Sequence, residues 1–192
     1  MKGKVIFLCG PSASGKTYCA EWLTEKWGDR YQLIYGLTTR PPRKGDKPGF
    51  QHVTREEYSE LNASGDLYGQ VEVAGHLYAT SLSQVMQAVQ EGKTAISILT
   101  PWAADDSIDR FYRLGVPMEI IYLGTTFPHW LKHICTRANP ILSPIKFVKR
   151  ILFDLKVIRY CKKYNKYVHF IKHYPFLNAK VWRLHKIATK EY

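Results

Sequence analysis

The sequence predicts an α/β fold in which helices cover both faces of a central parallel sheet. Apolar runs rich in strand-forming residues alternate along the chain with segments of helical character. Several of these runs are apolar at nearly every position, which is typical of strands buried on both faces. A glycine-rich loop joins the first run to the first helix, an arrangement that α/β folds use.

The first half of the chain divides into strands, helices and one long loop. The Pro-, Gly- and Arg-rich stretch 38–49 must be that loop. The Thr54 hydroxyl and the Glu57 side chain are spaced to form a capping box, which marks the start of a helix. We therefore expect strands over 4–9 and 31–37, strand pieces within 66–82, and helices over 16–27, over 55–63 and from Ser81 or Ser83 to Gln90.

The second half continues the alternation and ends in a helix. Two prolines make the stretch 139–144 irregular. Composition and periodicity predict strands over 94–99, 118–123 and 168–171, and helices over 105–114, 127–136, 145–164 and 178–190.

Length and composition fit one globular domain. The chain has 192 residues, of which 45% are hydrophobic, enough for a sizeable core. No apolar run is long enough to span a bilayer, and residues 1–8 read as a buried strand rather than a signal peptide. We therefore expect a cytoplasmic protein. The four cysteines show no zinc-binding spacing and are expected to be reduced and mostly buried.

The loop after the first predicted strand matches the phosphate-binding pattern G-x-x-x-x-G-K-[ST] in full. Glycines let the backbone wrap closely around phosphates, and the start of the next helix adds its positive dipole end. The lysine of this pattern reaches the β- and γ-phosphates, and the final hydroxyl ligates Mg²⁺. The loop therefore predicts a site for ATP and Mg²⁺, formed by Gly10, Pro11, Ser12, Ala13, Ser14, Gly15, Lys16 and Thr17.

Three further segments resemble the guanylate kinase family. They are the Thr-Thr-Arg-Pro-Pro-Arg run in 38–45, the segment 50–58, and the segment 71–81 with its Val-Glu-Val-Ala-Gly-His-Leu-Tyr sequence. Their order and spacing follow the family pattern, and with the phosphate loop the resemblance covers residues 1 to about 95. The chain departs from the pattern beyond that point.

The resemblance implies a P-loop kinase fold of three layers, with a central parallel sheet, an inserted monophosphate-binding region and a lid. On this view, residues 1–192 form a single domain. Its core is 1–35, 82–130 and 165–192, the monophosphate-binding region is 36–81 and the lid is about 136–146. The implied activity is ATP-dependent phosphoryl transfer to a nucleoside monophosphate, with GMP or dGMP favoured.

The resemblance also implies the acceptor site. In the family two arginines and two tyrosines hold the acceptor phosphate, and Arg40, Arg43 and Tyr78 match three of them. Paired guanidinium groups suit a phosphate dianion. Phe50 stands at the other tyrosine position and lacks the hydroxyl. Glu72 matches an acidic residue that reads guanine in the family, and Thr80 completes the same segment.

The lid region supplies two candidate catalytic arginines besides Lys16. Arg137 and Arg150 match the lid arginines that neutralise transferring phosphates in the family. The alternative is that both are merely solvated basic residues.

Some positions differ from the family pattern. Gly36 replaces a serine that helps to read the base, and the stretch 98–103 lacks two aspartates. Metal binding in P-loop kinases usually uses a carboxylate at a strand end, so the second Mg²⁺ contact is not identified. A related enzyme, ribose 1,5-bisphosphate phosphokinase, also lacks these aspartates.

Charge is concentrated in the last third of the chain. Residues 129–192 hold 15 Lys or Arg and two acidic residues, whereas residues 1–128 are nearly neutral. Such asymmetry suggests a polyanionic partner, which could be a triphosphate, nucleic acid or an acidic membrane surface. Basic residues interleaved with aromatics suit nucleic-acid binding, although helix faces with aromatics in the core are the favoured interpretation.

Three functions therefore stay open. The first is a nucleoside monophosphate kinase. The second is a kinase that acts on a nucleotide within DNA or RNA, or on another sugar phosphate such as ribose 1,5-bisphosphate. The third is an inactive binding module, which the intact Lys16 and Thr17 disfavour. Monomer and homodimer are both compatible with the sequence.

Overall fold

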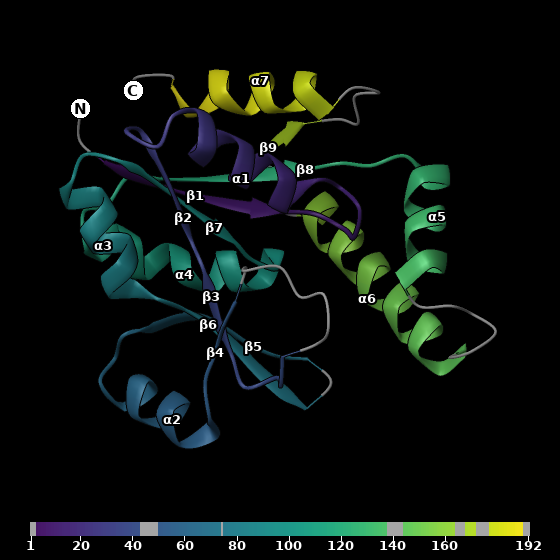
Figure 1. Cartoon of the computed structure of the whole chain (residues 1–192), viewed down its shortest axis with the longest axis horizontal. Coiled ribbons are helices and arrows are strands. Elements are labelled where there is room, and N and C mark those ends of the chain that lie inside the picture. Colours follow the sequence, from purple (N-terminus) through teal and green to yellow (C-terminus); the bar gives the residue numbers. More distant parts are fainter. Residues whose placement is uncertain are drawn as a thin grey trace.

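A computed structural model describes residues 3–42, 50–73, 75–137, 144–163, 168–171 and 177–189. The described part contains a five-stranded sheet and a four-stranded sheet (Figure 1). The five-stranded sheet is parallel throughout, with the order β2 (Tyr31–Ile34), β7 (Thr94–Ile98), β1 (Lys4–Cys9), β8 (Met118–Leu123) and β9 (Val168–Ile171). The first strand of the chain is therefore the central one.

Helices cover both faces of the five-stranded sheet. One face packs on α1 (Lys16–Lys26) and α7 (Leu177–Ala188), whose Leu23 and Leu184 are buried against Ile6. The other face packs on α3 (Leu82–Gln90) and α4 (Pro101–Arg113), whose Val85 and Phe111 are buried with strand residues. The predicted three-layer α/β fold with a central parallel sheet is confirmed.

The four-stranded sheet lies beside the carboxyl ends of β1 and β7. Its order is β4 (Phe50–His52), β3 (Gly36–Thr38), β6 (His76–Ser81) and β5 (Leu67–Val73). One face is covered by α2 (Arg55–Ala63), where Tyr58 packs with Leu37, Leu67 and Ala79. The Tyr68 hydroxyl of β5 lies 2.5 Å from the Ser97 hydroxyl of β7, which ties this sheet to the main one.

Two helices, α5 (Phe127–Arg137) and α6 (Pro144–Lys163), extend from the main sheet on the side of the phosphate loop (Figure 1). Residues 138–143, the centre of the predicted lid, lie outside the described residues. The division of the chain into core, monophosphate-binding region and lid stays a prediction. Among the helices that the structure describes, none combines the length and apolarity needed to cross a bilayer.

Most predicted elements are found, including the Thr54 capping box and the Ser81 cap of α3. Two predictions were wrong in detail, and one strand was missed. The strand expected over 31–37 is two strands, β2 and β3, in different sheets, because the chain turns out of the main sheet at the exposed Tyr35. Helix α4 begins at Pro101 rather than 105, since proline needs no hydrogen-bond partner in a first turn. Strand β4 was not predicted.

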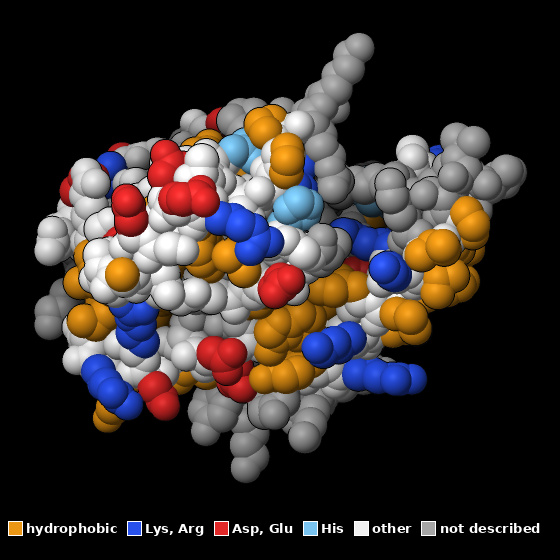
Figure 2. All heavy atoms as spheres, turned by 90° about the horizontal axis from the view of Figure 1, so that it is seen from below, with side chains coloured by type: hydrophobic (Ala, Val, Ile, Leu, Met, Phe, Trp, Pro, Cys, Tyr) orange, Lys and Arg blue, Asp and Glu red, His pale blue; other side chains and the backbone are white. Residues whose placement is uncertain are grey.

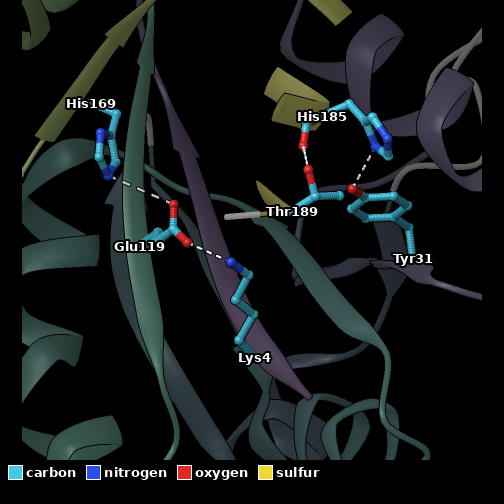
Figure 3. Close-up of polar contacts among 6 residues, drawn as sticks. All are labelled: Lys4, Tyr31, Glu119, His169, His185 and Thr189. Carbon is cyan, nitrogen blue, oxygen red and sulfur yellow. Dashed lines mark hydrogen bonds and ion pairs between the residues drawn. The ribbon is translucent and has the colours of Figure 1, made fainter. Parts of the chain in front are cut away.

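The C-terminal elements are fixed to the core by aromatic stacking and by polar contacts, of which Figure 3 shows the polar ones. The His185 ring of α7 stacks on Trp27 at 4.0 Å, and its Nδ1 lies 2.8 Å from the Tyr31 hydroxyl. On β8, the buried Glu119 pairs with Lys4 at 2.6 Å and lies 3.7 Å from His169 of β9. All four cysteines are free, as expected, and burial raises the thiol pKa of Cys161 to about 12.

Candidate active site

The phosphate loop runs from the end of β1 into α1, and its backbone explains two of its glycines. Gly10 has φ 141°, and a Cβ there would collide with the carbonyl oxygen of Leu123. Gly15 has φ 85° and forms the N-cap of α1. Both positions lie in the left-handed region that favours glycine. Ala13 also has a positive φ, 60°, which is uncommon for a residue with a side chain.

The Lys16 ammonium group lies over the loop that it belongs to. Its Nζ donates to the carbonyl oxygens of Gly10 and Pro11, both at 2.8 Å, and to Ser14 Oγ at 3.3 Å. These contacts hold a positive charge at the mouth of the loop. Thr17 lies in the first turn of α1 with its side chain exposed.

A buried carboxylate, Asp154 of α6, holds the loop from the other side. Its Oδ1 accepts from the backbone N–H of Ser12 at 3.1 Å and from Ser12 Oγ at 3.2 Å. Its Oδ2 accepts from Trp130 Nε1 of α5 at 2.9 Å. One carboxylate therefore joins the loop, α5 and α6.

Arg150 reaches the loop through the same serine. Its Nε donates to Ser12 Oγ at 2.8 Å, while the serine hydroxyl donates to Asp154. The guanidinium group of Arg150 thus lies at the phosphate loop. Arg137 ends α5, but its side chain lies outside the described residues.

Lys180 of α7 is a buried cation that contacts the loop. Its Nζ donates to the carbonyl oxygens of Ser14 at 2.7 Å and Gly124 at 2.8 Å, and the residue is 1% exposed. Desolvation lowers the pKa of its ammonium group. Sequence reasoning missed both Lys180 and Asp154. Asp154 had a signal, since it is one of two acidic residues in the last 64, whereas Lys180 had none among many lysines.

Two candidate acceptor residues, Tyr78 and Thr80, lie on the face of the four-stranded sheet that α2 leaves open. Cross-strand pairs place Thr38 opposite Tyr78 and Gly36 opposite Thr80 on this face. Arg40 follows β3, is 8% exposed and donates to the Pro41 carbonyl oxygen at 3.2 Å. Arg43 lies outside the described residues.

Phe50 and Gly36 fit together on the same face. The Phe50 ring lies edge-on to Tyr78, with ring centroids 5.7 Å apart. A Cβ at Gly36 would come within 2.9 Å of this ring. The two residues that differ from the family pattern, Gly36 and Phe50, are therefore coupled, because the Phe50 ring fills the volume that a side chain at 36 would occupy.

Glu72 does not lie with the other candidate acceptor residues. It pairs with Leu77 across the β5–β6 ladder, whereas Tyr78 pairs with Val71. Neighbouring residues of a strand point to opposite faces, so Glu72 lies on the side that α2 covers, and its side chain is exposed there. The structure therefore does not bring Glu72 and Tyr78 together on one face of the sheet.

The chemistry at the loop fits Mg²⁺ only in part. The Thr17 hydroxyl is an accessible oxygen donor of the kind that Mg²⁺ takes. Within the described ranges, no group of three or more His, Cys, Asp or Glu side chains is placed to hold a metal. Asp105, near the expected position of the missing aspartates, accepts from the Tyr160 hydroxyl at 2.9 Å.

Comparison with known proteins agrees with the geometry. A family model described as guanylate kinase matches residues 2–100. A guanylate kinase of Clostridium perfringens strain SM101 is 35% identical over 170 residues, covering 85% of this chain and 74% of that protein. The chain belongs to the guanylate kinase family. This family comprises nucleotide kinases, which are phosphotransferases.

The likeness to other guanylate kinases is strongest in the first half. The guanylate kinase of Nostoc sp. strain PCC 7120 is 36% identical over 98 residues, which are 50% of this chain and about half, 49%, of that protein. The crystal structure of a guanylate kinase from Anaplasma phagocytophilum superposes with a TM-score of 0.68 at 19% identity, covering 97% of this chain and 84% of that chain. This structural match shows a common fold that extends beyond the first half of the chain.

Proposed function

We propose that this protein transfers the γ-phosphoryl group of ATP to a nucleoside monophosphate, with GMP or dGMP as the favoured acceptor. The observation that carries the proposal is the placement of two sites at one edge of the main sheet. The phosphate loop follows β1, and the four-stranded sheet is tied to the end of the neighbouring β7. Ligands of α/β sheets bind at the carboxyl ends of strands.

In this proposal the chain contributes positioning and charge neutralisation rather than a covalent intermediate. The Lys16 ammonium moves from the loop carbonyls to the β- and γ-phosphates of ATP. Arg150, held at Ser12, neutralises charge on the transferred group. Mg²⁺, bound through Thr17 and phosphate oxygens, would supply further charge neutralisation.

On the acceptor side, Arg40 and Arg43 hold the monophosphate and Tyr78 supplies a hydroxyl donor. The carboxylate implied for guanine recognition, Glu72, lies on the opposite face of its strand pair from Tyr78. The name of the relatives favours GMP. Base selection is therefore the part of the proposal that most needs measurement.

The proposal is tested by measuring ATP consumption with Mg²⁺ against a panel of acceptors. The panel contains the nucleoside monophosphates, their deoxy forms, ribose 1,5-bisphosphate and single-stranded DNA. We expect turnover with GMP or dGMP, and a loss of about a hundredfold or more in Lys16→Ala, because the lysine contacts the transferred phosphates.

Lys26→Ala is the matched control, since Lys26 is an exposed lysine at the far end of the same helix. It should keep wild-type activity. Turnover of no monophosphate by folded protein would refute the proposal, and turnover of single-stranded DNA or ribose 1,5-bisphosphate alone would replace its acceptor.

A further inference from the structure

An apolar stripe runs along the outer side of α6. It consists of Ile145, Val148, Leu152 and Leu155, and we call it the α6 stripe. Ile145 is 71% exposed, Leu152 60%, Val148 52% and Leu155 38%. Their spacing of three and four residues places them on one side of the helix. Four adjacent large aliphatic side chains that are exposed to solvent indicate an interaction surface.

The α6 stripe faces away from the phosphate loop. Arg150 and Asp154, which contact Ser12, lie about halfway round the helix from Leu152 at 100° per residue. Val157 and Cys161 are buried on the same inner side. A nucleotide in the loop therefore does not cover the α6 stripe.

The charged side chains exposed around the α6 stripe are positive. Helix α6 contains seven Lys or Arg residues and one acidic residue, Asp154, which is buried. Lys149 and Lys156 are exposed on the flank of the stripe. In Figure 2, apolar side chains lie beside Lys and Arg side chains along the end of the molecule that α5 and α6 form. An occupant of this surface must be both apolar and anionic.

We propose that α6 docks this protein onto an anionic lipid surface, with the α6 stripe inserted at the level of the headgroups. Amphipathic helices with apolar residues on one face and Lys or Arg beside them bind membranes in this way. The inner half of α6 packs on α4 and α5, so the helix presents one exposed side to a flat surface. The phosphate loop then faces away from the lipid.

Other occupants fit the surface less well. A second copy of the chain would bring Lys149 and Lys156 towards their own copies without acidic partners on α6. Nucleic acid stacks on aromatic side chains, whereas the stripe is aliphatic. A protein groove that wraps a basic amphipathic helix needs more of its circumference than α6 leaves exposed. The inference goes beyond the proposed phosphoryl transfer and does not depend on it.

The test is co-sedimentation of the full chain with vesicles of phosphatidylcholine, alone or with about 30% phosphatidylglycerol, at about 0.15 M salt. We expect binding to the anionic vesicles only. The double variant Val148→Gln and Leu152→Gln should bind at least about tenfold more weakly, because it removes apolar insertion and keeps the charge. Lys149→Gln should also weaken binding.

The matched controls lie outside α6. Leu114→Gln changes an exposed leucine beyond α4, and Lys186→Gln removes an exposed lysine of α7. Both should bind anionic vesicles like wild type. Circular dichroism and thermal unfolding verify that the variants are folded, and if the double variant does not fold, the single variants Val148→Gln and Leu152→Gln replace it.

Several results would overturn the proposal. These are a lack of binding to anionic vesicles, equal binding by the folded variants and wild type, and equal weakening by Lys186→Gln and Lys149→Gln. The last would indicate adsorption through net charge. If light scattering showed that the wild type is a dimer and the double variant a monomer, the α6 stripe would be assigned to contact with a second copy of the chain. If the wild type bound oligonucleotides or an acidic protein but not vesicles, and the double variant lost that binding, the α6 stripe would be assigned to that partner.

Discussion

At the scale of single residues, a small change at Phe50 offers a direct test of the proposed acceptor site. Its ring lies on the open face beside Tyr78, at the position where the guanylate kinase pattern has a tyrosine. The missing oxygen is a potential donor to the acceptor phosphate. The ring itself is already in place and exposed.

We predict that Phe50→Tyr lowers the KM for the monophosphate by about tenfold with little change in kcat. A hydrogen bond to a charged group contributes about 1.5–3 kcal/mol. Steady-state kinetics with varied monophosphate measure this effect. Tyr112→Phe, at an exposed tyrosine of α4, is the control and should leave the KM unchanged. An unchanged KM in Phe50→Tyr would mean that the ring does not face the acceptor phosphate.

Asp154 offers a second test at residue scale, because all three of its contacts donate to the carboxylate. In Asp154→Asn, the amide NH₂ must face at least one of these donors. We expect a loss of about 1–3 kcal/mol in the free energy of unfolding and a higher KM for ATP. Urea unfolding and kinetics measure the two effects.

Asp105→Asn is the matched control, since Asp105 accepts one hydrogen bond, from Tyr160, and is less buried. It should cost less than Asp154→Asn. Equal stability of wild type and Asp154→Asn would show that the carboxylate does not hold the loop.

At the scale of elements, α7 shows what the sequence could and could not predict. Its existence follows from periodicity and its bounds were predicted closely. Its role did not follow, because the contacts of Lys180 with the loop and of His185 with Tyr31 join residues more than 150 positions apart. Local patterns carry no information on such pairs.

The same limit explains β3 and β4. The run 31–37 is uniformly strand-like, and only the departure of the chain at Tyr35 assigns its two halves to different sheets. The backbone of the loop 10–17, by contrast, was predictable, because a contiguous motif encodes its local shape. The face that Glu72 occupies was not predictable, because the ladder register, shifted between Tyr68 and Val71, decides it.

A pH-dependent stability of α7 follows from His185. Desolvation, assisted by the nearby Arg30, lowers the pKa of its imidazole below the ordinary value of 6.5. The unfolded chain therefore takes up the proton first as pH falls, and the contribution of the neutral ring, complete above about pH 6.5, is lost below it.

We predict that the thermal midpoint falls between about pH 7 and pH 5, and that His185→Gln reduces this slope. Calorimetry across the pH series measures both. His76→Gln, on β6 of the other sheet, is the control and should keep the wild-type slope. Parallel slopes for wild type and His185→Gln would contradict the assignment.

At the scale of the whole molecule, the phosphate loop connects elements from both ends of the chain. The β1–α1 loop is contacted by α6 through Asp154 and Arg150, and by α7 through Lys180, which also contacts Gly124 after β8. The network that holds the loop therefore reaches the least family-like third of the sequence. The helix α2, on the far side of the four-stranded sheet, is outside this network.

We predict that ATP with Mg²⁺ slows hydrogen exchange in α6, α7 and the end of β8, and leaves α2 unchanged. Binding that stabilises the loop raises the free energy of opening for the elements bonded to it. Mass spectrometry of peptic fragments measures the protection, and Lys16→Ala with ATP is the control. Protection confined to the loop itself would mean that these contacts do not transmit the stabilisation.

The shared space of Gly36 and Phe50 restricts how this protein can be redesigned. The ring at 50 occupies the volume that any side chain at 36 would need. In a library of variants that changes position 36 alone, most residues larger than glycine would be harmful and would be discarded. Only variation of both positions at once can produce proteins in which a polar group at 36 coexists with a ring at 50 in another position. Redesign of this face must therefore vary residues 36 and 50 together.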